Sequence, residues 1–103
     1  MTYYDIQIDP ASTATDPLLH GTFRETAQND QIIPSGLEAL AALPLTGGKS
    51  IRFNGPCTVP LAMAIAHAVA HRYGYVACFD PKMQGYVVVI SHHPDFRTGQ
   101  LVD

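Results

Sequence analysis

The sequence has few cysteines, few basic residues and no long apolar run, and each shortage excludes a class of protein. Two cysteines, Cys57 and Cys78, cannot form the disulfide framework of a small secreted domain. Six Lys and Arg against nine Asp and Glu give a formal net charge of −3, which argues against a surface for duplex DNA. His67 and His71 interrupt the longest apolar stretch, and from the polar, acidic N-terminus we expect no signal peptide. We therefore expect a soluble cytoplasmic protein with no membrane or duplex DNA partner.

What the sequence does have is enough apolar residues for one core. Its 103 residues are 47% apolar and 15% charged, which excludes a disordered chain and predicts a single domain over residues 1–103. Tyr3 to Ile8 alternates as a strand does, and residues 18–26 predict a weaker strand. Ser35 and Glu38 have the spacing of a capping box, which predicts a short helix over residues 37–43.

The C-terminal half predicts a strand, a helix and a hairpin. We expect strands over residues 50–54 and 75–79, joined by a helix that starts at residue 58 or 59 and ends near residue 73. Strand, helix and strand in that order predict a parallel crossover, and residues 85–90 close a C-terminal hairpin. The helix is apolar almost all round, which predicts burial against the sheet and a second surface, such as another subunit. The expected class is α/β, with a mixed sheet.

The turn formed by Asn54, Gly55 and Pro56 is a candidate phosphate site. It lies between a strand end and a helix start, where free N–H groups and the positive end of the helix dipole attract anions. The alternative is an ordinary turn that uses Gly55 for its conformation and Thr58 as a helix cap. Pro56 also removes one donor from the turn.

His67 and His71 are four residues apart, so they share one face of the predicted helix. Their spacing is that of zincin metalloproteases, but Ala68 stands where the glutamate would be, which argues against such a site. The negative end of the helix dipole favours a protonated His71, which makes it the better candidate acid or base. We expect packing roles for His67 and for both cysteines.

Two strand ends carry the remaining candidates. Asp80 could bind a divalent metal or activate a water, and Lys82 could hold a phosphate. The alternative is an exposed turn opened by Asp80 and Pro81. His92 and His93 end the last strand and point to opposite faces, so only one of them could join Asp80 in a manganese or zinc site.

In their order and spacing, these motifs resemble the small stand-alone ring nucleases of type III CRISPR systems, the Csx-three (Crn-three) family. The resemblance covers roughly residues 50–102. It rests on the Gly55-Pro56 turn, the helix that leads to His71, the strand Val-Ala-x-Phe-Asp-Pro, the strand Gly-Tyr-Val-Val-Val, and Ser91-His92.

The resemblance implies a ring-nuclease-like domain that forms homodimers and cleaves the second messenger cyclic tetra-adenylate to linear oligoadenylates, which switches off type III CRISPR effectors. It implies that two dimers sandwich one ring, as a ligand-induced tetramer or stacked assembly, with active groups from opposite faces. His71 and Asp80 are the catalytic residues it implies, and Asp80 and His92 would hold a divalent metal, manganese. The expected substrate-binding residues are Asn54, Gly55, Pro56 and Lys82.

Two positions depart from the family pattern. Lys82 stands where an arginine is usual and lacks the two-pronged guanidinium that grips a phosphate. Gln100 stands where an acidic residue is expected, which puts the family's metal site in question. Three alternatives stay open: a non-catalytic sensor of cyclic oligoadenylate, a 3′ exoribonuclease that removes adenylates from RNA, and a metal-binding or oligomerisation module.

Overall fold

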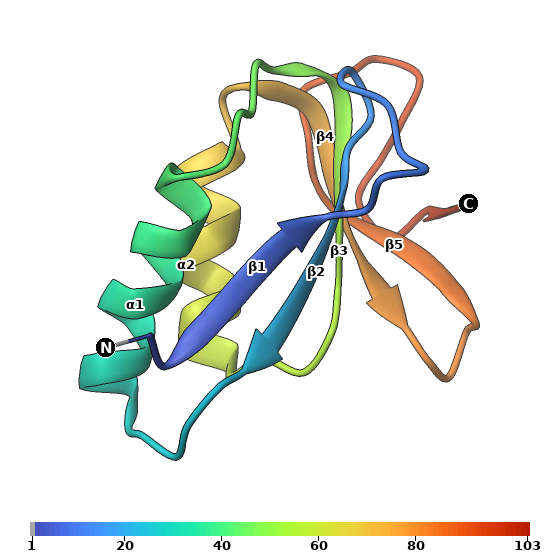
Figure 1. Ribbon diagram of the computed structural model, residues 1–103. Coiled ribbons are helices and arrows are strands. Elements are labelled where there is room, and N and C mark those ends of the chain that lie inside the picture. Colours follow the sequence, from blue (N-terminus) through green and yellow to red (C-terminus); the bar gives the residue numbers. More distant parts are fainter. Residues whose placement is uncertain (1) are drawn as a thin grey trace.

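A computed structural model describes residues 2–103, in which one six-stranded sheet carries two helices on one face (Figure 1). The strands lie in the sheet in chain order: β1 (Tyr4–Ile8), β2 (Leu18–Phe23), β3 (Gly48–Asn54), β4 (Tyr73–Asp80), β5 (Gly85–Ser91) and β6 (Leu101–Val102). Strands β2, β3 and β4 are parallel, and the other neighbours are antiparallel. The α/β class with a parallel crossover and a C-terminal hairpin is confirmed.

Helix α1 (Asn29–Ala41) connects β2 to β3, and helix α2 (Val59–Val69) connects β3 to β4. Both lie on the same side of the sheet, so the main core forms between them and the strands (Figure 1). Apolar residues of α2 at four-residue spacing face this core, as expected for an amphipathic helix. The core includes Tyr4, Ile6, Leu19, Ile51, Leu61, Ile65 and Val69.

Helix α1 begins earlier than predicted, at Asn29, and it contains Pro34. The capping-box interpretation was wrong, because Ser35 Oγ accepts hydrogen bonds from two backbone N–H groups at the start of β1 instead of capping its own helix. Burial along one face of α1 offsets the hydrogen bond that the proline removes. The buried residues are Ile32, Gly36 and Leu40.

Helix α2 ends at Val69, before the predicted end at Tyr73. Tyr73 begins β4 instead, with its ring buried and its hydroxyl accepting a 3.2 Å hydrogen bond from the N–H of Gly47. His71 therefore lies in the turn between α2 and β4 and does not share a helix face with His67. The helix stops early because burying the tyrosine ring in the sheet stabilises the fold more than one further helical turn would.

A second, smaller core lies on the sheet face without helices. Tyr75, Ala77 and Val88 are buried there, and the ring of Phe96 packs on that of Tyr75 at 4.5 Å between centroids. The C-terminal segment thus covers part of this face and leaves the β1–β3 part open. Of the helices in residues 2–103, none has the length and apolar character needed to cross a membrane.

Candidate functional site

The predicted site residues lie at two opposite ends of the sheet (Figure 1). One end, which we call the histidine end, holds His71 and His92, because β4 starts there and β5 returns there. The other, which we call the turn end, holds the β3–α2 turn and the β4–β5 turn. Its predicted residues are Asn54, Gly55, Pro56, Asp80 and Lys82.

The length of β4 keeps the two ends apart within one chain. Tyr75, near the start of β4, pairs with Ser91, whereas Asp80, at its end, pairs with Gly85. At about 3.3 Å per residue, the strand from Tyr75 to Asp80 spans roughly 16 Å. Asp80 and His92 therefore cannot share a metal ion within one chain, and the predicted metal pair stays a prediction for a site between copies. Across residues 2–103, no three His, Cys, Asp or Glu side chains gather where they could hold a metal ion.

The histidine end presents two exposed imidazoles. The rings of His71 and His92 stack with their centroids 5.4 Å apart and their planes at 29°. The backbone beneath them is ordered, since the N–H of His92 donates to the carbonyl of Gly74 at 2.7 Å. Ser91 Oγ donates to the carbonyl of Phe96, also at 2.7 Å, and holds the following turn. Both rings can therefore meet a ligand or a second protein surface.

Packing roles were predicted for His67, Cys57 and Cys78, and the structure places only Cys57 against the main core. His67 is exposed in the last turn of α2, so a packing role for it was wrong. Cys57 packs beside Tyr4 against the main core, and burial raises the pKa of its thiol, which argues against a reactive thiolate. Cys78 is exposed, contrary to expectation, although partial burial and then the charge of Asp80 raise its thiol pKa.

The β3–α2 turn is constrained by packing. Gly55 has a φ of +126°, and a Cβ there would clash with the carbonyl oxygen of Gly21. The Tyr4 hydroxyl donates to the Pro56 carbonyl at 2.7 Å, and Thr58 caps helix α2 with its side chain. The alternative interpretation of an ordinary turn therefore accounts for the glycine and the threonine, and phosphate contact at this turn stays a prediction.

Asp80 has one oxygen occupied and one available. Its Oδ1 accepts hydrogen bonds from the backbone N–H groups of Lys82 at 2.9 Å and Met83 at 3.2 Å. These two bonds fix the carboxylate in the β4–β5 turn and leave Oδ2 without a hydrogen bond among residues 2–103. The Lys82 side chain is exposed beside it. The turn end thus offers an oriented carboxylate next to an exposed positive charge.

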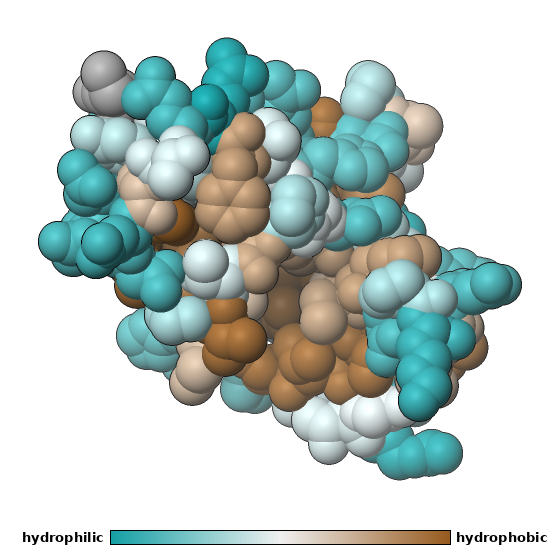
Figure 2. Space-filling view, turned by 90° about the horizontal axis from the view of Figure 1, so that it is seen from below, coloured by the Kyte–Doolittle hydropathy of each residue, from teal (hydrophilic) through white to brown (hydrophobic). Residues whose placement is uncertain are grey.

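An apolar groove runs between α2 and the β4–β5 hairpin toward the turn end. Figure 2, which looks onto this end, shows hydrophobic side chains gathered around a hollow. Val59 and Met63, on the outward side of α2, are 73% and 68% exposed. We predicted that α2 is buried against a second surface as well as against the sheet. The structure leaves this second apolar side of α2 uncovered. The groove is lined by Val59, Ala62, Met63, Ala66, Val76 and Val89, among others.

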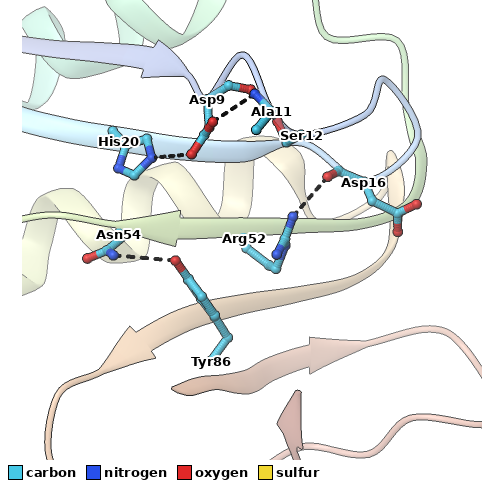
Figure 3. Close-up of polar contacts among 8 residues, drawn as sticks. All are labelled: Asp9, Ala11, Ser12, Asp16, His20, Arg52, Asn54 and Tyr86. Atoms are coloured by element: carbon cyan, nitrogen blue, oxygen red, sulfur yellow. Dashed lines mark hydrogen bonds and ion pairs between the residues drawn. The ribbon is translucent and has the colours of Figure 1, made fainter. Parts of the chain in front are cut away.

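The sequence did not reveal three polar residues on the open face of the sheet, His20, Arg52 and Tyr86 (Figure 3). His20 is the register partner of Asn54 across β2 and β3. The Asn54 side-chain amide donates to the Tyr86 hydroxyl at 3.3 Å, and the guanidinium of Arg52 lies 5.6 Å from the centre of the Tyr86 ring. For His20 the missing signal was the pairing of β2 with β3, because residues 18–26 looked only weakly strand-like.

Gln100 has a structural place in this chain. Its side-chain oxygen accepts a 3.1 Å hydrogen bond from the N–H of Arg97, and its carbonyl accepts one from Val88 at 2.9 Å. The residue thus closes the turn that leads into β6. The departure from an acidic residue leaves this turn intact and supplies no carboxylate.

The family model described as CRISPR-associated protein (Cas_csx3) matches residues 25–103. The match includes α1 and every residue predicted for catalysis, substrate binding or metal binding, and so extends further than the resemblance found from the motifs. A search of curated proteins returned no match.

Proposed function

The chain belongs to the CRISPR-associated Csx3 family, and we propose that it is a ring nuclease that cleaves cyclic tetra-adenylate to linear oligoadenylates. The observation that carries the proposal is the placement of the acid–base candidates at opposite ends of one sheet. The predicted residues divide between them: the imidazoles of His71 and His92 lie at the histidine end, and the oriented carboxylate of Asp80 and the ammonium of Lys82 lie at the turn end. Two copies that clasp one ring, histidine end against turn end, would assemble a complete site.

The substrate itself supplies the nucleophile. In a 3′–5′ RNA linkage the 2′-hydroxyl can attack the neighbouring phosphorus, and the bond from phosphorus to O5′ then breaks. His71 would take the proton from the 2′-hydroxyl or give one to the departing O5′. The Lys82 ammonium would stabilise the negative charge that develops on the phosphate oxygens. Asp80 Oδ2, which makes no hydrogen bond among residues 2–103, would orient the imidazole from the other copy.

The expected metal fits only between copies. Asp80 of one copy and His92 of another are the residues that would hold it, because within one chain they lie at opposite ends of the hairpin. A bound divalent ion such as manganese would supply charge stabilisation at the phosphate. The roles given to His71 and Lys82 do not depend on it.

We assign the expected homodimer contact to the apolar groove. The exposed side chains of Val59 and Met63 form an apolar surface of the kind that subunit contacts bury. Met63→Glu should shift the protein toward the monomer in analytical ultracentrifugation, because the new carboxylate would lose its water on association. His67→Ala, also on the exposed side of α2, is the matched control and should leave the mass unchanged.

The experiment that tests the function is incubation with cyclic tetra-adenylate at protein in excess of ring, with and without manganese. We expect linear adenylates from the wild type and an intact ring with His71→Ala or Asp80→Ala. His67→Ala, which removes an exposed histidine from α2, should cleave normally. An intact ring with the wild-type protein would overturn the proposal. Tight binding without product would favour the second candidate function, a non-catalytic sensor. The sensor is also favoured by the division of the candidate residues between two ends of a single chain.

A further inference from the structure

Asp9 and His20 form a hydrogen-bonded pair on the open face of the sheet (Figure 3). His20 Nε2 lies 3.0 Å from Asp9 Oδ2. The carboxylate is held independently of the ring, because Oδ1 accepts the N–H of Ala11 at 2.8 Å and the Asp9 carbonyl accepts from the Ser12 hydroxyl at 2.7 Å. An ordered carboxylate orients the imidazole with little further loss of side-chain freedom.

The pair determines which ring nitrogen is presented to a ligand. The hydrogen bond with His20 is the main cause that lowers the pKa of the Asp9 carboxyl, with the Ala11 N–H as the next. An ionised carboxylate can only accept, so Nε2 must carry the proton of a neutral ring. Nδ1 is then an acceptor, and it makes no hydrogen bond among residues 2–103. The side chain of His20 is 47% exposed, so Nδ1 can be reached from solvent.

The pair also lies beside the turn end. His20 is in register with Asn54, and the next residue, Gly21, packs against Gly55. Beyond Asn54 lies Tyr86, whose ring has the guanidinium of Arg52 over it. An acceptor nitrogen on β2, an amide on β3 and an aromatic ring on β5 therefore lie in a row on the open face of the sheet (Figure 3). A ribose and its base present the matching groups: hydroxyl donors and a planar ring.

We propose that His20, oriented by Asp9, is a further substrate-contacting residue, and that its Nδ1 accepts a hydrogen bond from a ribose 2′-hydroxyl of the bound adenylate. This inference rests on the proposed function, and it adds a residue that distinguishes RNA from DNA. Asp9 is the positioning residue that holds the ring in the tautomer with an acceptor at Nδ1.

The test compares affinities for cyclic tetra-adenylate and for its fully 2′-deoxy analogue. The wild type should bind the ribose ring about tenfold more tightly than the deoxy ring, a usual size for one buried hydrogen bond. His20→Leu should lower affinity for the ribose ring to the deoxy value and leave deoxy binding nearly unchanged. His20→Asn should retain part of the preference, because its side-chain oxygen can occupy the place of Nδ1.

Asp9→Asn tests the tautomer. Its amide oxygen can keep the Ala11 hydrogen bond while its NH2 group donates to His20 Nε2, so that the proton moves to Nδ1. This variant should also lose the preference for ribose, with the fold intact because both side chains lie on the surface. In the wild type, the ¹⁵N resonance of Nδ1 should have the shift of an unprotonated nitrogen and should move when the ribose ring is added.

The outcomes separate this inference from the proposed function. Failure of the wild type to bind the ribose ring would overturn both. Binding with the same ribose-to-deoxy ratio in the wild type and His20→Leu would overturn only the role of His20. An Nδ1 resonance that does not move on addition of the ring would overturn it as well, even if the variants were to unfold.

Discussion

The histidine end and the turn end differ in how firmly their functional side chains are held. At the histidine end, the rings of His71 and His92 stack with their centroids 5.4 Å apart, and neither ring makes a hydrogen bond among residues 2–103. At the turn end, Asp80 accepts two backbone hydrogen bonds, and Asn54 donates to Tyr86. A side chain held in this way needs little ordering when a ligand arrives. In the proposed assembly of two copies, the turn end would be the pre-organised half of the site, and the histidine end would adjust as it docks.

The largest expected effect comes from inactivating the two ends in separate variants, which tests whether both ends are needed for cleavage. His71→Ala and Asp80→Ala should each lower ring cleavage by at least about 100-fold, as expected for loss of an acid–base group. A mixture of the two variants should recover part of the activity, because some assemblies combine the intact histidine end of one with the intact turn end of the other. Product formation is measured under single-turnover conditions. A mixture as inactive as its components would show that each chain carries its own complete site.

A second change tests how rigid the turn end is without a ligand. Gly55→Ala should destabilise the protein by about 2–4 kcal/mol, because its φ of +126° suits only glycine and the new Cβ meets the Gly21 carbonyl. Gly99→Ala is the matched control: its φ is +89°, but no atom lies within 4 Å of the added Cβ. We expect a loss of about 1 kcal/mol there. Urea unfolding measures both, and equal losses would contradict the close contact.

A third change varies the charge at the turn end. Lys82→Ala should weaken ring binding about tenfold, the usual size for a hydrogen bond to a charged group. Lys82→Arg should strengthen it about threefold, because the guanidinium can bind a phosphate through two N–H groups. Lys49→Arg is the control, since Lys49 lies over the Phe96 ring. Fluorescence anisotropy with a labelled ring gives the affinities, and identical binding by Lys82→Ala would remove this residue from the site.

The smallest effect concerns pH and stability. The hydrogen bond from His20 holds the pKa of Asp9 below its usual value of about 3.9. The carboxylate therefore adds stability above the unfolded pKa, and that contribution is lost as pH falls through the lower folded pKa. Asp9→Asn should be slightly less stable than the wild type at pH 6, with a smaller difference near pH 2.5. Urea midpoints at both pH values measure this.

The control for that measurement lies at the histidine end. Asp95 Oδ2 is 4.0 Å from His93 Nδ1, and the carboxylate is largely exposed. Asp95→Asn should therefore change the urea midpoint less than Asp9→Asn does at pH 6. A larger change at the histidine end would reverse the comparison of the two ends.

The fold could be predicted where local patterns and tertiary packing agree. The β3–α2–β4–β5 order followed from apolar periodicity and from the turns at Gly55 and Asp80. The start of helix α1 was misplaced, because Pro34 and the Ser35–Glu38 spacing both indicate a helix start that packing overrides. The end of α2 was misplaced because a buried tyrosine at position 73 fits the core face of a strand as well as that of a helix.

The candidate site was predictable as a set of residues but not as an arrangement. His71, Asp80 and His92 stood out because titratable groups end apolar elements. Their separation depends on the antiparallel register of β4 and β5, which is a property of the paired strands. His20 was missed for the same kind of reason, since only its pairing with Asn54 brings it to the turn end.

The sequence by itself determined the α/β class, the parallel crossover, the chemical types of the site residues and, through its motifs, the CRISPR-associated family. Only the tertiary structure decided that these residues divide between two ends of one sheet and that β2 adds a histidine to one of them. The physical reason is that side-chain chemistry and periodicity are local along the chain. Strand direction and register, by contrast, are settled by which apolar faces can be buried together.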